Sequence, residues 1–274
     1  MRIATWNVNS IRARSETVVA WMEHHDVDVL AMQETKCHDD AFPLMSFLVA
    51  GYDVTHVGQG AYNGVAIASR VGLDEIEVGF EGMPPLSVDG REIVEARAIS
   101  ARCAGVRVWS LYVPNGRAID DPHYRYKLAW LEALADRSAL WLAHDPAAQI
   151  MLAGDWNVAQ RDTDVWDPGF FAGKPHVSDA ERAAIAAFLD AGLTDSALPY
   201  ADGYTFWDYT SLRFPRNEGM RIDFILGSHA FADAVVAASI HRDERKGEIP
   251  SDHVPVVVDL DLEGPDDDDR PMIF

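Results

Sequence analysis

The sequence predicts an α/β protein in which helices cover sheets that are buried on both faces. Three observations favour this class. Many short apolar runs are typical of buried strands, two long segments have the spacing of amphipathic helices, and no linker rich in proline or glycine interrupts the interior of the chain. With 274 residues, 48% of them hydrophobic, the chain can form one large domain or two small ones without stabilising disulfides.

The first half of the chain is expected to consist mostly of strands. A helix is expected at residues 14–25, where Val18, Trp21 and Met22 follow helical spacing. The strands of this half are expected at residues 2–8, 27–34, 63–70, 94–100 and 106–113.

The second half contains the two long helices. One is expected at residues 123–144, and the other at residues 178–192, where Ser178 and Glu181 have the spacing of a capping box. Strands are expected at residues 149–158, 220–227 and 253–260. Residues 263–274 include four consecutive aspartates and are expected to form a disordered acidic tail, which leaves residues 1–262 as one domain.

The charge of the chain argues against a polyanionic ligand when it is considered alone. There are 44 acidic and 23 basic residues, a net charge of −21, and nucleic-acid affinity rests mostly on basic contacts to phosphate. Part of the acidic excess lies in the tail, however. Basic residues recur in the loops that follow the expected strands, at Arg12, Arg14, Lys36, Arg117, Arg125, Lys127, Arg213, Arg216, Arg221, Arg242, Arg245 and Lys246. They would either surround a site at the strand ends or be spread over a solvated surface.

Neither membrane insertion nor secretion is indicated. No apolar run approaches the roughly 18 residues of a membrane-spanning helix, and the first residues lack the basic and apolar blocks of a signal peptide. Cys37 and Cys103 are too few for a disulfide framework, so a reducing cytoplasm is expected and both thiols are expected to be inert.

Polar residues recur at or just beyond the ends of the expected strands. They are Asn7, Glu34, Tyr112, Asp155, Asn157, Asp223, Asp252 and His253. A single residue of this kind is more often a turn former or a helix cap. Their recurrence indicates a polar, acid-rich pocket if the strand ends converge. Carboxylate and amide oxygens suit Mg²⁺ or Mn²⁺, and such an ion usually completes its shell with substrate phosphate, so phosphate-ester chemistry is expected.

Two local patterns refine this expectation. Asp155 and Asn157 are two residues apart, so on an extended segment they would point the same way, and an Asx turn is the alternative. Asp223 would fix the tautomer of His253 and favour its protonated form if their strands are neighbours, whereas a plain strand cap is the alternative for this histidine.

Several segments resemble the exonuclease III family, the abasic-site endonucleases of the endonuclease/exonuclease/phosphatase superfamily. The resemblance runs from about Ile3 to Leu260 and is carried by "ATWNVNSIRAR", "QETKCHDDAFP", "LAGDWNV", "TFWDY", "RIDFIL" and "SDHVPV". "SDH" is shared by the whole superfamily, whereas "QETKCHDDAFP" and "TFWDY" with "RIDFIL" are specific to the DNA-repair branch. The resemblance implies a four-layer α/β sandwich, with two mixed β-sheets face to face and helices outside, as a single catalytic domain.

The resemblance also implies roles for these residues. By position, Glu34 is similar to the principal metal ligand of the family. The further metal contacts that the resemblance implies are Asn7, Asp252 and Asp155. Asp155 is similar to the residue that orients or deprotonates the attacking water, although the sequence leaves open whether Asp155 or His253 is the general base. Tyr112 and Asn157 are similar to phosphate-oxygen donors, and Asp223 with His253 to a carboxylate–imidazole pair. The substrate-binding residues implied are Arg12, Lys36, Arg117, Phe206, Trp207, Met220 and Ile222, among which Phe206, Met220 and Ile222 correspond to an apolar slot for a base-less deoxyribose.

The expected function is that of a Mg²⁺-dependent, monomeric phosphodiesterase of DNA repair. The family resemblance implies incision of double-stranded DNA 5′ to abasic sites and removal of nucleotides or blocking groups from 3′ ends. One alternative is a superfamily hydrolase that acts on RNA, a lipid headgroup or an inositol phosphate. Another is a DNA-binding module without enzymatic activity on the same scaffold.

Overall fold

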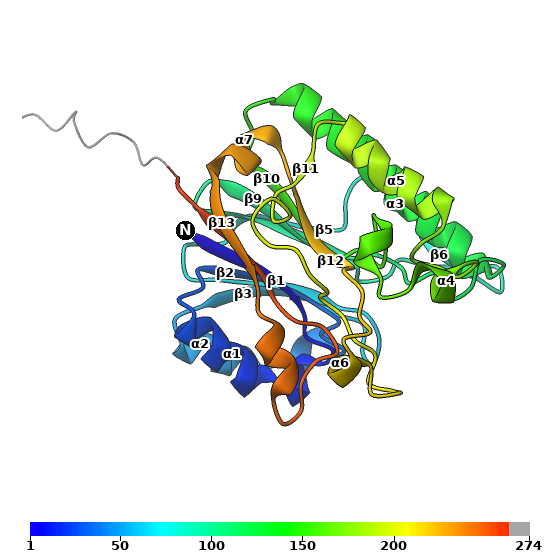
Figure 1. The fold of residues 1–274 in the computed structure, drawn as a ribbon. Helices are drawn as coiled ribbons and strands as arrows, with labels where there is room; N and C mark the ends of the chain where they lie inside the picture. The colour runs from blue at the N-terminus through cyan, green and yellow to red at the C-terminus, as the bar shows by residue number, and fades with distance from the viewer. Residues whose placement is uncertain (263–274) are drawn as a thin grey trace, which may run out of the picture.

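Two six-stranded mixed sheets pack face to face in the computed structural model, which describes residues 1–262, and helices cover their outer faces (Figure 1). This arrangement confirms the expected four-layer α/β sandwich. The acidic tail expected at residues 263–274 lies outside the described residues. No helix within residues 1–262 has both the length and the apolar character needed to cross a membrane.

The first sheet makes the first and last strands of the described chain neighbours. Its strand order is β13 (Val235–Ile240), β14 (Val256–Leu260), β1 (Arg2–Asn7), β2 (Val29–Gln33), β4 (Val65–Ser69) and β3 (Asp53–Val57). α1 (Ser15–His24) connects β1 to the parallel strand β2, and Asn7 pairs with Gln33. Because β14 runs antiparallel to β1, the residues just before β14 reach the same edge of the sheet as Asn7.

The second sheet aligns three of the expected polar residues. Its strand order is β11 (Thr194–Asp195), β12 (Asp223–Gly227), β10 (Ile150–Asp155), β9 (Val106–Tyr112), β8 (Ala98–Cys103) and β5 (Asp74–Val78). β10 is parallel to β9 and antiparallel to β12. Its last residue, Asp155, pairs with both Tyr112 and Asp223, so all three lie in one row at the sheet edge.

Apolar side chains fill the layers between these elements. The inner faces of the two sheets form the central core, which includes Ile3, Val29, Ile67, Val108, Met151, Ile225 and Val258. α1 and α2 (Leu44–Val49) cover the outer face of the first sheet, and α3 (Pro122–His144) and α5 (Asp179–Asp190) cover that of the second. The expected capping box is present at α5, since Ser178 Oγ accepts from the Glu181 N–H and the Glu181 carboxylate accepts from the Ser178 N–H, both at 3.2 Å.

The sequence missed several strands at the edges of the fold. β3, β5 and β13 have half-exposed or exposed residues, so they lack the apolar runs that identified the central strands. The strand expected at residues 94–100 begins only at Ala98, and the one expected at 149–158 ends at Asp155. The remaining short elements are the β6 (Leu86–Val88)–β7 (Arg91–Ile93) hairpin, α4 (Pro168–Phe171), α6 (Arg213–Arg216) and α7 (His229–Ala234).

Candidate active site

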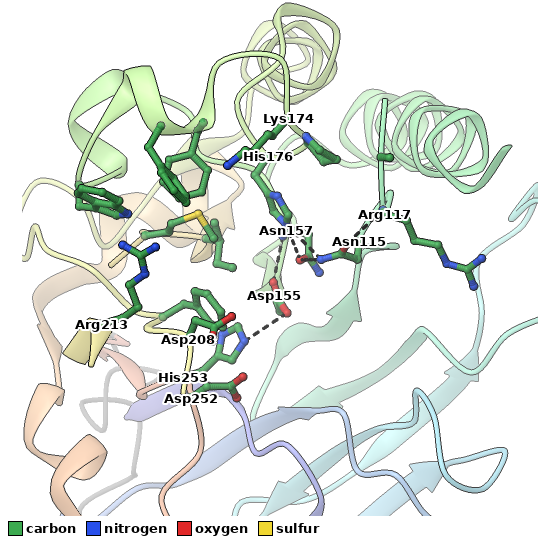
Figure 2. A pocket seen from close by; sticks show the side chains of 18 of the residues that line it. Asn115, Arg117, Asp155, Asn157, Lys174, His176, Asp208, Arg213, Asp252 and His253 are labelled. Atoms are coloured by element: carbon green, nitrogen blue, oxygen red, sulfur yellow. Dashed lines mark hydrogen bonds and ion pairs between the residues drawn. The ribbon is translucent and has the colours of Figure 1, made fainter. Parts of the chain in front are cut away.

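A cavity of about 890 Å³, hereafter the strand-end pocket, lies where the polar edges of both sheets meet. Six of the residues expected at strand ends line it: Glu34, Tyr112, Asp155, Asn157, Asp252 and His253. Figure 2 shows four of them, Asp155, Asn157, Asp252 and His253, within this pocket. Asn7 and Asp223 are fully buried behind the lining, and each contacts residues that line the pocket.

Two carboxylates and an imidazole form a compact group in the strand-end pocket. One ligand atom from each of Glu34, Asp155 and His253 lies within 4.8 Å of the others, and the carboxylate oxygens of this group suit a divalent metal ion. Asn7 Nδ2 donates to Glu34 Oε1 at 2.8 Å and to Asp155 Oδ2 at 3.0 Å, so its amide nitrogen rather than its oxygen faces the carboxylates. Asp252 accepts from Asn9 Nδ2 at 2.8 Å and lies outside the group. Asn7 therefore contacts the group through hydrogen bonds, and Asp252 lies apart from it.

Lys36 balances the charge of Glu34. Its Nζ lies 2.6 Å from Glu34 Oε2 and 2.6 Å from Asn9 Oδ1. Burial would raise the pKa of Glu34, but Lys36 and the hydrogen bond from Asn7 outweigh burial and lower that pKa. Glu34 is therefore ionised at neutral pH, which is the state that binds a hard cation.

A buried aspartate fixes the orientation of His253. Nδ1 of the imidazole lies 2.8 Å from Asp223 Oδ2, and Thr205 Oγ1 donates to the same oxygen at 2.6 Å. Nε2 consequently faces Asp155, with 3.8 Å between Nε2 and Asp155 Oδ2. Burial would lower the pKa of His253, but the charges of Asp223 and Asp155 raise it to about 10. The imidazole is therefore a cation at neutral pH and a hydrogen-bond donor on both nitrogens.

Asp155 has an unusually basic carboxylate. Burial raises its pKa to about 7, with the charges of Asp223 and Glu34 adding to burial and that of His253 opposing it. A carboxylate in this range takes up a proton near neutral pH far more readily than an exposed aspartate does. The two partners in the pocket thus differ in role, since His253 holds its proton and Asp155 can accept one.

Asp155 and Asn157 reach the strand-end pocket through a turn. Asp155 Oδ1 accepts from the Asn157 N–H at 3.0 Å, and Asn157 has a left-handed φ of 52°. The extended segment expected here was wrong, because the strand ends at Asp155 and the Asx turn follows directly. Glycine is needed at position 154, since a Cβ there would overlap the carbonyl oxygen of Leu111 on the neighbouring strand.

A buried lysine on α3 joins three loops of the pocket. Lys127 Nζ donates to the backbone oxygens of Asn157 at 2.6 Å and Asn115 at 3.3 Å, and it forms an ion pair with Glu181. Glu181 also accepts from the His176 N–H at 3.0 Å. Both charged side chains are 0% exposed. Lys127 was expected among basic residues around the site, and that expectation was wrong because its side chain points into the interior.

Tyr112 is supported by an arginine that the sequence did not single out. Arg97 Cζ lies 4.8 Å from the centroid of the Tyr112 ring, and Arg97 Nε donates to Glu95 Oε2 at 2.7 Å. Burial raises the pKa of Tyr112 well above its ordinary value, and the charges of Glu34 and Asp155 add to this effect. Tyr112 therefore remains a phenol that can donate a hydrogen bond.

The expected substrate-binding residues do not all reach the strand-end pocket. Those that line it are Arg117, Phe206, Met220 and Ile222. Lys36 does not line it but forms an ion pair with Glu34, which does. Arg12 and Trp207 do not line it, and Trp207 is only 1% exposed because it packs against Phe214. Other basic residues that recur in the loops after the expected strands are also buried, namely Arg14, Arg221 and Arg245.

Some lining residues were not identified from the sequence. They include Asn115, Trp166, Phe170, Phe171, Lys174 and His176. Most of them lie between β10 and α5, in a segment without a strand or a long helix, so periodicity gave no signal for them.

Comparison with known proteins gives consistent matches over nearly the whole chain. Residues 4–253 match the model of the endonuclease/exonuclease/phosphatase family. Exodeoxyribonuclease III of Haemophilus influenzae is 32% identical over 93% of this chain and 98% of its own. A 3′ phosphatase from Neisseria, solved with a product DNA hairpin, is 36% identical with a TM-score of 0.88, over 96% of this chain and all of its own. An AP endonuclease from Archaeoglobus fulgidus is 34% identical with a TM-score of 0.87 over the same shares.

Proposed function

The chain belongs to the endonuclease/exonuclease/phosphatase family, in its exonuclease III branch, and we propose that it hydrolyses phosphate esters of double-stranded DNA in a Mg²⁺-dependent reaction that leaves a 3′-hydroxyl. Three substrates share this outcome. The first is a strand that is cut on the 5′ side of an abasic site, the second is a 3′-terminal nucleotide, and the third is a 3′ blocking group such as phosphate. The observation that carries the proposal is the group of Glu34, Asp155 and His253 in one pocket.

The residues of the strand-end pocket have complementary roles in this reaction. Asp155 takes a proton from the attacking water, because its pKa lies near neutrality. The His253 cation donates a hydrogen bond from Nε2 to a phosphoryl oxygen and stabilises the charge that develops there, while Asp223 keeps the ring oriented. Tyr112 donates from its phenol to a second phosphoryl oxygen. The P–O3′ bond breaks as the water oxygen bonds to phosphorus, and the 3′ oxygen leaves.

Glu34 would hold the divalent ion, which suits its oxygen donors and supplies positive charge to the phosphate. Replacing Glu34 with alanine is expected to raise the Mg²⁺ concentration for half-maximal activity by about tenfold or more, because a metal-binding carboxylate is lost. Activity measured over a range of Mg²⁺ concentrations gives this half-maximal concentration. Glu132→Ala, on the exposed face of α3, is the control. An unchanged Mg²⁺ dependence in Glu34→Ala would refute the role of this carboxylate.

Arg117 is proposed to contact the DNA backbone from the wall of the pocket. Replacing it with alanine is expected to weaken binding to an uncleaved duplex and to make the slope of log K against log salt shallower by about 0.9, the value for one phosphate contact. Fluorescence anisotropy between low and moderate salt, in EDTA, gives both quantities. Arg102→Ala, an exposed arginine paired with Glu75, is the matched control. An unaltered slope would remove Arg117 from the interface.

Labelled duplexes provide the direct test of the proposed function. They carry a single abasic site, a 3′-phosphate or a 3′-terminal mispaired nucleotide, and each is incubated with Mg²⁺ or with EDTA. Cleavage that ends in a 3′-hydroxyl and stops in EDTA is the expected result. Hydrolysis of RNA, an inositol phosphate or a lipid headgroup in place of all three duplexes would favour the alternative family activities, and metal-independent binding without cleavage would favour a binding module.

Cellular location and assembly remain predictions from the sequence. A reducing cytoplasm is consistent with Cys37 and Cys103, which are both buried and free. Burial raises the pKa of the Cys103 thiol to about 11, so this thiol is unreactive at neutral pH. A monomer is proposed, and its molecular mass in solution would test that.

A further inference from the structure

The strand-end pocket extends well beyond its catalytic groups. Its volume of about 890 Å³ falls near the upper end of the range for cavities that enclose whole small molecules. Three aromatic residues, Trp166, Phe170 and Phe171, form one wall of it, hereafter the aromatic wall. Lys174 and Arg213 lie on the side of this wall, across the pocket from Arg117 (Figure 2). A base-less sugar and its phosphate would leave much of this space unfilled.

The aromatic wall is continuous with the apolar slot formed by Phe206, Met220 and Ile222. Trp166 and Phe170 have ring centroids 5.0 Å apart, and Phe170 and Phe171 have centroids 5.1 Å apart. Phe171 and Phe206 both pack against the buried cluster that contains Met220 and Ile222. A ligand that places its sugar in the slot therefore meets aromatic rings next.

Phe170 is held at the surface of the pocket rather than in the core. It is 40% exposed, which is high for a phenylalanine. Asp167 caps the short helix α4 by accepting from the N–H groups of Gly169 at 2.8 Å and Phe170 at 3.2 Å. This cap fixes the backbone that presents the ring, so the wall is built before any ligand arrives.

Cations border the aromatic wall. Lys174 Nζ lies 3.6 Å from the centroid of the Phe170 ring, and Arg213 Cζ lies 4.9 Å from the rings of Trp166 and Phe170. Arg213 is paired with Glu218, whereas Lys174 has no acidic partner among residues 1–262. An aromatic surface with an unneutralised cation beside it matches a nucleotide, which combines a flat ring with an anionic backbone.

We propose that the aromatic wall binds the unpaired nucleobase of a 3′-terminal nucleotide whose phosphate lies at Asp155 and His253. The inference rests on the proposed function and adds a base-binding subsite to it. A paired base stays in the helical stack, whereas a mispaired terminal base is cheap to extrude and can stack on protein rings.

Two substrates that differ only in the presence of a base test this subsite. One duplex ends in a mispaired 3′ nucleotide, and the other ends in a base-less 3′ nucleotide at the same position. Phe170→Ala is expected to lower the ratio of their kcat/KM values, mispaired over base-less, by about tenfold, since stacking of one base has an effect of this size. Phe170→Tyr keeps a ring and should restore the ratio. Leu140→Ala, an exposed apolar residue on α3 outside the pocket, should leave it unchanged.

The outcomes separate this inference from the proposed function. An equal loss on both substrates in Phe170→Ala would mean that the wall only supports the fold of the pocket, and an unchanged ratio would mean that no base binds there; either result overturns the inference. If the wild type cleaves neither these duplexes nor the duplex with an abasic site, the proposed function fails. Whenever these two duplexes are not cleaved, binding alone tests the inference. Fluorescence of a terminal 2-aminopurine in EDTA is then the readout: quenching that disappears in Phe170→Ala supports the base subsite, and quenching that is absent or persists in this variant overturns it.

Discussion

Replacing His253 with alanine is expected to lower kcat by about a thousandfold, the middle of the range for loss of one positioned proton-transfer or charge-stabilising group. The effect is large because the imidazole is a buried cation aimed at Asp155, and a water molecule in the vacated space would not carry its positive charge. Single-turnover cleavage of the labelled duplex measures the loss. His229→Ala, an exposed histidine on α7, is the control. Activity within tenfold of wild type would exclude His253 from the reaction.

The partner of His253 provides a second measurement of the same effect. Asp223→Asn should also lower kcat, because the aspartate orients the ring and favours its charged form. In a chain that already carries His253→Ala, Asp223→Asn should add little further loss, since groups that act as a unit are strongly non-additive. Full additivity would show that Asp223 acts independently of the imidazole.

Replacing Lys127 with methionine is expected to reduce the free energy of unfolding by about 3–5 kcal/mol, the usual loss when one member of a buried ion pair is removed. The methionine would leave the Glu181 carboxylate fully buried without its counter-charge and would release the backbone oxygen of Asn157. Urea unfolding measures the change. Lys246→Met, in an exposed pair with Asp243, should leave the free energy of unfolding nearly unchanged, because solvent screens this pair.

The double variant Lys127→Met/Glu181→Gln separates charge from packing. Removal of the orphaned carboxylate should recover part of the stability lost in Lys127→Met. The activity of both variants should stay low, because the loops of Asn115 and Asn157 lose their shared donor. Wild-type stability in Lys127→Met would show that the ion pair contributes little to holding the three loops.

The sequence predicted the polar residues at the ends of central strands. Glu34, Asp155 and His253 adjoin apolar runs that are buried on both faces, and such runs are recognisable without a structure. Their convergence depends on strand order, which the apolar runs do not specify and for which the family resemblance supplied only the sandwich architecture. Edge strands such as β3 and β5 had no comparable apolar signal.

Other features of the site depend on information that periodicity does not contain. The left-handed conformation of Asn157 follows from a turn, and the sign of φ at a single asparagine cannot be derived from residue type. Lys127 resembled a surface lysine because its partner, Glu181, lies on a different helix 54 residues away. Phe170 was not identified from the sequence, since only the position of α4 shows that its ring faces a cavity.

The pairing of the first strand with the last one has a consequence for protein synthesis. β1 and β14 are neighbours, so Asn7 is translated long before His253, the residue that it contacts. A nascent polypeptide that has not yet reached β14 therefore cannot assemble the hydrolytic centre.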